Sequence, residues 1–146
     1  MSTYLHKSGI ILDIKGNNKK DILTGLAEGV IKSAGEIDNL IEDLVKRESL
    51  KTTGIGNGVA FPHHRSDAVN EIYMSIGISK QGLLFDAIDD KPVNLFFLVV
   101  CPENLGVEQM KLISRIARQL KEKSVREKLK EMNNADELIS YLERIF

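Results

Sequence analysis

The stretch "VNLFFLVV", residues 93–100, carries apolar residues on both of its alternating faces. A strand with one face in solvent alternates polar and apolar residues, whereas a strand covered on both faces is an almost continuous apolar run. The stretch is therefore predicted to be a central β-strand with helices on either side. Continued to Cys101, the run is still far too short to span a bilayer, so we expect no direct membrane insertion.

A second strand is predicted just upstream, in "EIYMSIGISK", residues 71–80. Its apolar residues alternate with polar or small ones, and they are Ile72, Met74, Ile76 and Ile78. This period of two predicts a strand covered on one face only, with Tyr73, Ser75 and Gly77 on the other face. In the intervening "FDAIDDKPV", Asp89, Asp90 and Pro92 have turn chemistry, so a short irregular connection is expected.

Two amphipathic helices are predicted before these strands. The segment "NNKKDILTGLAEGVIKSAG", residues 17–35, has apolar residues at helical spacing and ends at Gly35, where a left-handed C-cap belongs. The segment "DNLIEDLVKRES", residues 38–49, is expected to begin at Asp38. Arg47 then lies in its last turn, where the helix dipole favours a cation.

The C-terminal third of the chain is also predicted to be helical, since "VEQMKLISRIARQLKEK" carries an apolar stripe. Two capping-box patterns, Ser124 with Glu127 and Asn134 with Glu137, predict the starts of two further helices. No repeat, low-complexity segment or linker interrupts the sequence. Residues 1–146 are therefore expected to form a single α/β domain, a mixed β-sheet flanked by helices on both faces.

The composition excludes several classes of function. Lys and Arg number 20 against 21 Asp and Glu, so no basic field favours nucleic acid or an anionic membrane. The single Cys101 builds no disulfide framework and is predicted to be a buried, inert thiol. The N-terminal segment lacks the pattern of a signal peptide. We therefore expect a soluble cytoplasmic protein whose partners are proteins or small molecules.

The segment "TGIGNGVAFPHHR", residues 53–65, is the most unusual part of the sequence. Its glycine spacing fits neither the dinucleotide fingerprint nor a Walker A loop. A glycine-rich turn can still bring backbone N–H groups around an anion. The predicted phosphoryl-binding loop consists of Thr53, Gly54, Gly56, Asn57 and Gly58. Pro62 fixes its own φ and extends the preceding residue, so His63 follows a stiff stem.

Phosphoryl transfer is the chemistry that these residue types favour. A neutral imidazole is a nucleophile that accepts phosphoryl groups, and a guanidinium stabilises the charge on the phosphoryl oxygens. His63 is the expected acceptor, and Arg47 or Arg65 supplies the guanidinium. On the residues alone, an ordinary surface turn and a helix-end arginine remain open as alternatives.

A metal site is the other reading of the paired histidines. His63 and His64 are neighbours on an extended segment, so their side chains point to opposite sides. A tetrahedral site would need further ligands from a chain with one Cys and one more histidine, His6. No metal and no cofactor are therefore expected.

The residues T-G-I-G-x-G-x-A-x-P-H, from Thr53 to His63, match a known family in order, with "KRESLKTTGIG" upstream and "FDAIDDKPVNLFFLVVCP" downstream. The chain resembles the enzyme IIA domain of the fructose/mannitol class of the bacterial phosphotransferase system, which includes the nitrogen-regulatory IIA proteins. The resemblance extends from about Ile10 to Leu142. It implies a mixed sheet flanked by helices, and phosphorylation of His63 on Nε2 by the phosphocarrier HPr or its nitrogen-branch counterpart. Arg47 matches the family's arginine upstream of the loop.

The sequence departs from this family at two positions. His64 stands where a small residue is common; it could hydrogen-bond the phosphoryl group or compete as a minor acceptor, but we expect its side chain to face the solvent. His64 and Arg65 are the candidate modulators of the site. Gln109 stands where many members have a second histidine. A glutamine can donate a hydrogen bond to a phosphoryl oxygen but cannot shuttle a proton. We expect Gln109 to lie within side-chain reach of His63.

The resemblance leaves two roles open. In a transport relay, His63 passes the phosphoryl group to a cysteine of a separate IIB domain. In a regulatory switch, the unphosphorylated surface binds targets such as kinases or potassium transport proteins, and the absence of sugar-specific domains favours this role. A metal-dependent hydrolase and a non-catalytic binding module using the same loop are the remaining alternatives.

Overall fold

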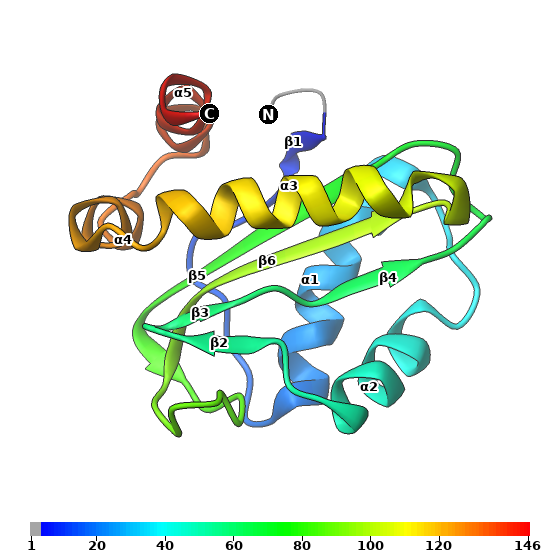
Figure 1. The fold of residues 1–146 in the computed structure, drawn as a ribbon, viewed down its shortest axis with the longest axis horizontal. Coiled ribbons are helices and arrows are strands. Elements are labelled where there is room, and N and C mark those ends of the chain that lie inside the picture. Colours follow the sequence, from blue (N-terminus) through cyan, green and yellow to red (C-terminus); the bar gives the residue numbers. More distant parts are fainter. Residues whose placement is uncertain (1–3) are drawn as a thin grey trace.

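The computed structural model describes residues 4–146, and it is shown in Figure 1. The strands are β1 (Leu5–Ile11), β2 (Gly54–Gly56), β3 (Val59–Ala60), β4 (His63–Arg65), β5 (Tyr73–Leu83) and β6 (Val93–Cys101). The helices are α1 (Lys19–Ala34), α2 (Leu40–Leu50), α3 (Gly106–Gln119), α4 (Lys123–Lys130) and α5 (Ala135–Ile145), with a 3-10 turn, η1 (Glu103–Leu105), before α3. The N-terminal segment predicted to lack a signal peptide begins with three residues that lie outside this range.

The sheet is mixed, and its strand order is β1-β5-β6-β3-β2, with β4 also paired to β6. β5 and β6 are antiparallel, whereas β3 and β4 both run parallel to β6. As predicted, β6 is central and is covered on both faces, with residues 95–101 all buried. The predicted α/β class with helices on both faces is confirmed.

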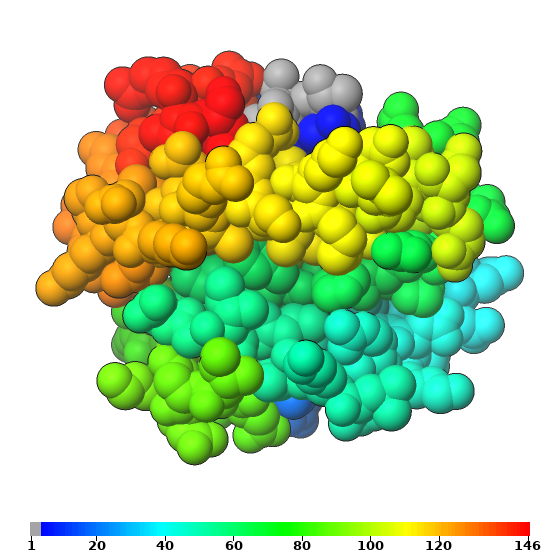
Figure 2. All heavy atoms as spheres, in the orientation of Figure 1, coloured from blue at the N-terminus to red at the C-terminus, as the bar shows by residue number. Residues whose placement is uncertain are grey.

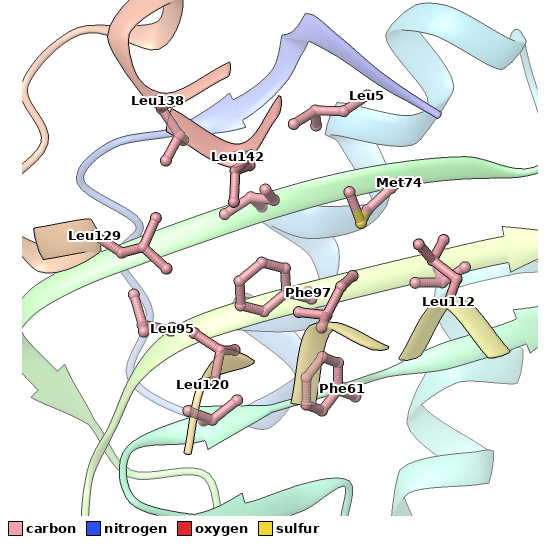
Figure 3. Packing of buried hydrophobic residues seen from close by; sticks show 14 of the residues in the cluster. Leu5, Phe61, Met74, Leu95, Phe97, Leu112, Leu120, Leu129, Leu138 and Leu142 are labelled. Atoms are coloured by element: carbon pink, nitrogen blue, oxygen red, sulfur yellow. The ribbon is translucent and has the colours of Figure 1, made fainter. Parts of the chain in front are cut away.

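Two apolar cores separate the sheet from its two layers of helices. One core lies under α3, α4 and α5. Figure 3 shows Leu95 and Phe97 of β6 and Phe61, between β3 and β4, near Leu112 of α3 and Leu120, the residue after α3. The other core lies under α1 and α2. Cys101 belongs to the first core and is fully buried, as predicted, and burial raises the pKa of its thiol.

The prediction that β5 is covered on one face only is wrong. Ser75 is fully buried, and its hydroxyl donates a hydrogen bond of 2.7 Å to the carbonyl of Leu26 on α1. A Cβ on Gly77 would lie 2.8 Å from the terminal Cδ1 of Ile14, so Ile14 packs closely against the glycine on this face. Small and hydroxyl-bearing residues on this face let α1 approach closely, although the same residue types are common on strand faces exposed to solvent.

Two predicted helix starts are also wrong. Helix α2 follows Asn39 rather than Asp38, and Asn39 takes the left-handed conformation with φ 60°, which asparagine tolerates. Helix α4 begins at Lys123, so Ser124 lies inside it and caps nothing. The cap at Asn134 is confirmed, since its side chain accepts a hydrogen bond of 3.1 Å from the Glu137 N–H.

The predicted glycine loop is a β-hairpin of β2 and β3. Its two-residue turn is Asn57-Gly58, with φ values of 56° and 76°. Asn-Gly is the preferred pair for a hairpin turn with positive φ at both positions. Across residues 4–146 no helix has the length and apolar character needed to span a membrane.

Candidate functional site

His63 is the first residue of β4, a three-residue strand whose pairing partner is β6. Its ring Nδ1 lies 2.9 Å from the carbonyl oxygen of Phe61. Because a carbonyl oxygen only accepts hydrogen bonds, Nδ1 carries the proton and Nε2 keeps its lone pair. The short stem therefore holds the ring in one tautomer, with Nε2 as the free nucleophile.

The surroundings of His63 favour a neutral ring. Burial is the main cause that lowers the pKa of His63 below 6.5, and the nearby guanidinium groups of Arg47 and Arg65 lower it further. The hydrogen bond to Phe61 and the carboxylate of Glu48 oppose this shift. At neutral pH the imidazole is therefore uncharged, which is the nucleophilic form.

An open hollow of ≈ 370 Å³ surrounds the ring, and it is lined by Arg47, His63, His64, Arg65 and Glu103. Arg47 reaches the hollow from α2, and its Nη1 donates a 3.0 Å hydrogen bond to the carbonyl of Lys51. Figure 2 shows the face on which α3, in yellow, and α2, in cyan, lie on either side of the green strands. The structure thus brings both predicted guanidinium groups to His63.

Arg65 is held in place by the start of α3. Its Nε donates a 3.3 Å hydrogen bond to Gln109 Oε1, and its Nη1 lies 4.0 Å from Glu103 Oε2. The guanidinium also lies against Gly106, where an added Cβ would be only 2.5 Å from Arg65 Cζ. Glycine at the first position of α3 therefore provides the space that the guanidinium fills.

Gln109 is fully buried beside the acceptor strand. Its Nε2 donates hydrogen bonds of 3.0 Å to the carbonyls of His64 and Val99, and Val99 is the pairing partner of His63. The structure thus places Gln109 against the backbone next to His63. Both of its N–H donors are already used within the protein, so neither is free for a phosphoryl oxygen. Gln109 instead joins β4, β6 and Arg65.

His64 follows His63 on β4, and its side chain lies against α2 at the border of the same hollow. Its Nε2 lies 3.6 Å from Asp43 Oδ2 on α2, and its side chain is 22% exposed. The predicted solvent-facing orientation is therefore wrong, because α2 covers this face. The described residues, 4–146, contain no cluster of three or more His, Cys, Asp and Glu that could hold a metal ion.

The structure does not bring the tip of the glycine hairpin to His63. The Gly58 carbonyl accepts hydrogen bonds from Asn94 and Leu95, at the start of β6, whereas His63 pairs with Val99. Five residues of strand separate Asn94 from Val99, a distance of roughly 16 Å. Gly56, Asn57 and Gly58 therefore lie away from the hollow. Of the predicted loop, only its start approaches the stem, where the Thr53 carbonyl accepts a 3.0 Å hydrogen bond from Phe61.

Sequence reasoning missed Glu48. This carboxylate is buried on α2, and both of its oxygens accept hydrogen bonds from Thr53. The signal was available, because Leu40, Leu44 and Glu48 follow one another at intervals of four along the buried stripe of the helix. An acidic residue that continues an apolar stripe indicates a buried polar contact.

Comparison with known proteins agrees with this geometry. Residues 3–145 match the family model described as phosphoenolpyruvate-dependent sugar phosphotransferase system, EIIA 2. A nitrogen regulatory protein of Bradyrhizobium diazoefficiens is 33% identical over 134 residues, 91% of this chain and 88% of that protein. The fructose-specific EIIA component of Haloferax volcanii is 38% identical over 101 residues, 67% of this chain and 66% of that protein.

Solved structures show the same fold. The nitrogen regulatory protein IIA-Ntr from Neisseria meningitidis superimposes with a TM-score of 0.85 at 33% identity, covering 94% of each chain. The complex of the mannitol IIA enzyme with phosphorylated IIB from Escherichia coli matches with a TM-score of 0.79 at 22% identity, covering 93% of this chain and 94% of that chain. This chain belongs to the EIIA type 2 family of the phosphotransferase system, whose members have phosphocarrier or regulatory roles.

Proposed function

We propose that His63 accepts a phosphoryl group on Nε2 from a phosphorylated carrier protein, either HPr or its nitrogen-branch counterpart. The observation that carries this proposal is the bond between Nδ1–H and the Phe61 carbonyl, which leaves Nε2 as a fixed, neutral nucleophile facing the hollow. Histidine in this form attacks phosphorus without first losing a proton. Arg47 and Arg65 stabilise the charge on the phosphoryl oxygens during transfer.

A protein donor needs a surface beside the ring. Val107 and Met110 expose apolar side chains on α3, next to Arg65 and Glu103, around a second hollow of ≈ 430 Å³. Exposed apolar residues beside a reactive group favour a protein partner over a small molecule. The proposal includes a cytoplasmic location, because the carrier must meet His63 in solution.

Two fates of the phosphoryl group are proposed as alternatives. In the first, a IIB cysteine receives it for sugar uptake, as the fructose-specific relative and the mannitol IIA–IIB complex suggest by their names. In the second, phosphorylation switches binding to a regulatory target. The regulatory role is favoured, because a relative that is 33% identical over 91% of this chain is named a nitrogen regulatory protein.

The test is incubation with phosphoenolpyruvate, enzyme I and HPr, followed by intact mass. We expect a gain of about 80 Da that is lost in acid and is absent in His63→Ala. His64→Ala should still gain it. The incubation is repeated with the nitrogen-branch counterpart of HPr and its own enzyme I. No gain in mass with either carrier would refute the proposal. Adding a fructose-type IIB domain separates the two fates, since a relay passes the group to the IIB cysteine and a switch retains it.

A further inference from the structure

A chain of hydrogen bonds connects a buried carboxylate to the reactive ring. Glu48 is 3% exposed, and its two oxygens accept bonds of 2.6 Å and 2.7 Å from the N–H and the hydroxyl of Thr53. The Thr53 carbonyl accepts a bond of 3.0 Å from Phe61, and the Phe61 carbonyl accepts the bond of 2.9 Å from His63. Each residue in this series of hydrogen bonds thus fixes the position of the next one.

The buried carboxylate has no cationic partner within 4 Å among residues 4–146. Burial of a charge is costly unless hydrogen bonds compensate for it, and here Thr53 alone supplies them. A neutral, apolar residue would fill the same place on the stripe of α2 without this cost. The position therefore calls for an explanation beyond packing.

We propose that Glu48 is a positioning residue and a buried counter-charge for His63. Through Thr53 it fixes the Phe61 carbonyl that selects the tautomer of the ring. Its negative charge stabilises the positive charge that the ring acquires on phosphorylation. This inference rests on the proposed function, which assigns phosphoryl acceptance to Nε2.

The chemical step shows where that charge arises. The Nε2 lone pair forms a bond to phosphorus while the bond from phosphorus to the nitrogen of the donor's phosphohistidine breaks. The other nitrogen of the donor ring carries a proton, so the phosphorylated donor ring is positively charged; when the electron pair of the broken bond returns to it, the donor leaves as a neutral imidazole. The Nδ1 proton stays on His63 throughout, held by Phe61, and the phosphorylated ring therefore carries a formal positive charge. No proton transfer is required in either direction.

The charged groups facing this ring make the counter-charge necessary. Arg47 on α2 and Arg65 on β4 both oppose a positive ring, while they favour the phosphoryl oxygens. His64 faces α2, and Glu103 on η1 is largely exposed, with 65% of its side chain accessible. Glu48 is the buried anion that acts on His63, and solvent screens it least.

The decisive variant is Glu48→Gln, which keeps the size of the side chain and removes its charge. Glu42→Gln is the matched control, because Glu42 is an exposed carboxylate on the same helix and its loss changes the net charge equally. Nitrogen-15 NMR of the ring should show the pKa of His63 falling further in Glu48→Gln, together with the appearance of the Nε2–H tautomer. Glu42→Gln should match the wild type. An unchanged pKa and tautomer in folded Glu48→Gln would overturn the proposal.

Phosphoryl transfer gives the second readout. The rate of phosphoryl acceptance from phospho-HPr should fall about tenfold in Glu48→Gln. Losses of this order are typical when a residue that orients a functional side chain is replaced. If Glu48→Gln does not fold, Glu48→Asp keeps the charge but is too short for both Thr53 bonds, and a tautomer mixture is expected. Wild-type tautomer and rate in Glu48→Asp would overturn the proposal. If the wild type itself is not phosphorylated, the proposed function fails, while the NMR result still decides whether Glu48 positions the ring.

Discussion

Replacement of Gln109 tests whether its buried amide holds the site together. Gln109→Met has nearly the same volume, so it creates little cavity and little overpacking. It removes three hydrogen bonds, two to the carbonyls of His64 and Val99 and one from Arg65. Any change in stability therefore reports on these bonds.

The expected loss follows from the burial of the amide. Gln109 is fully buried, so water cannot replace it on either strand carbonyl. A net hydrogen bond contributes ~1 kcal/mol and an unpaired buried polar group costs ~1–3 kcal/mol. The free energy of unfolding should therefore fall by roughly 2–4 kcal/mol. For a chain of this size that loss corresponds to a drop in Tm of about 5–15 °C.

Urea unfolding followed by circular dichroism measures this loss directly. Gln119→Met is the control, since it makes the same exchange on the same helix at a half-exposed position. We expect the control to change the free energy by no more than about 0.5 kcal/mol. If Gln109→Met were equally mild at an unchanged urea dependence, the three bonds would contribute nothing and our account of the residue would be wrong.

Four further predictions concern the site and the hairpin. Gly106→Ala should slow phosphoryl acceptance by ~3–10-fold, because its Cβ displaces the Arg65 guanidinium, and should change unfolding free energy by less than ~1 kcal/mol. Gly58→Ala should lower stability by ~1–3 kcal/mol in urea unfolding, since φ is +76° and Asn94 Oδ1 would lie 2.7 Å from the Cβ. Phosphorylation should be unchanged, and a loss of phosphorylation would instead support the predicted phosphoryl-binding loop. The rate of phosphoryl acceptance should be constant above pH 7. It should fall on acidification below pH 6.5, since the pKa of His63 is lowered from that value and protonation removes the nucleophile. A rate that rises in acid would contradict a neutral nucleophile. The same shift destabilises the fold as pH falls from 6.5 to the folded pKa, and His63→Ala should lose this dependence.

The layers of the fold could be predicted because they depend on local patterns. The uninterrupted apolar run of β6 requires cover on both faces, and the structure supplies it. The second buried face of β5 could not be predicted in the same way. Serine and glycine on a strand resemble solvent-facing residues, and only the close approach of α1 explains Ser75 and Gly77.

The candidate site was predictable only in part, for a similar reason. His63 and its stem are adjacent in sequence, so the stiff approach to the ring could be read directly. The three glycines of the hairpin predict an anion-binding loop, whereas the Asn57-Gly58 pair is the stronger signal and indicates a two-residue hairpin turn. Two of the three partners of Gln109 lie 44 and 45 residues away on β4, and only the tertiary structure brings them to this side chain.

The position of His63 in the sheet explains why two buried polar side chains serve one ring. β4 has three residues and pairs only with β6, so backbone pairing alone gives the ring weak support. Gln109 ties β4 to β6 from α3, on one face of the sheet. Glu48 ties the stem to α2, on the other face, through Thr53. One edge of the imidazole is thereby fixed from both sides while Nε2 stays open to a partner. A strand that is short and weakly paired can expose its reactive atom only because helices on both faces hold its backbone.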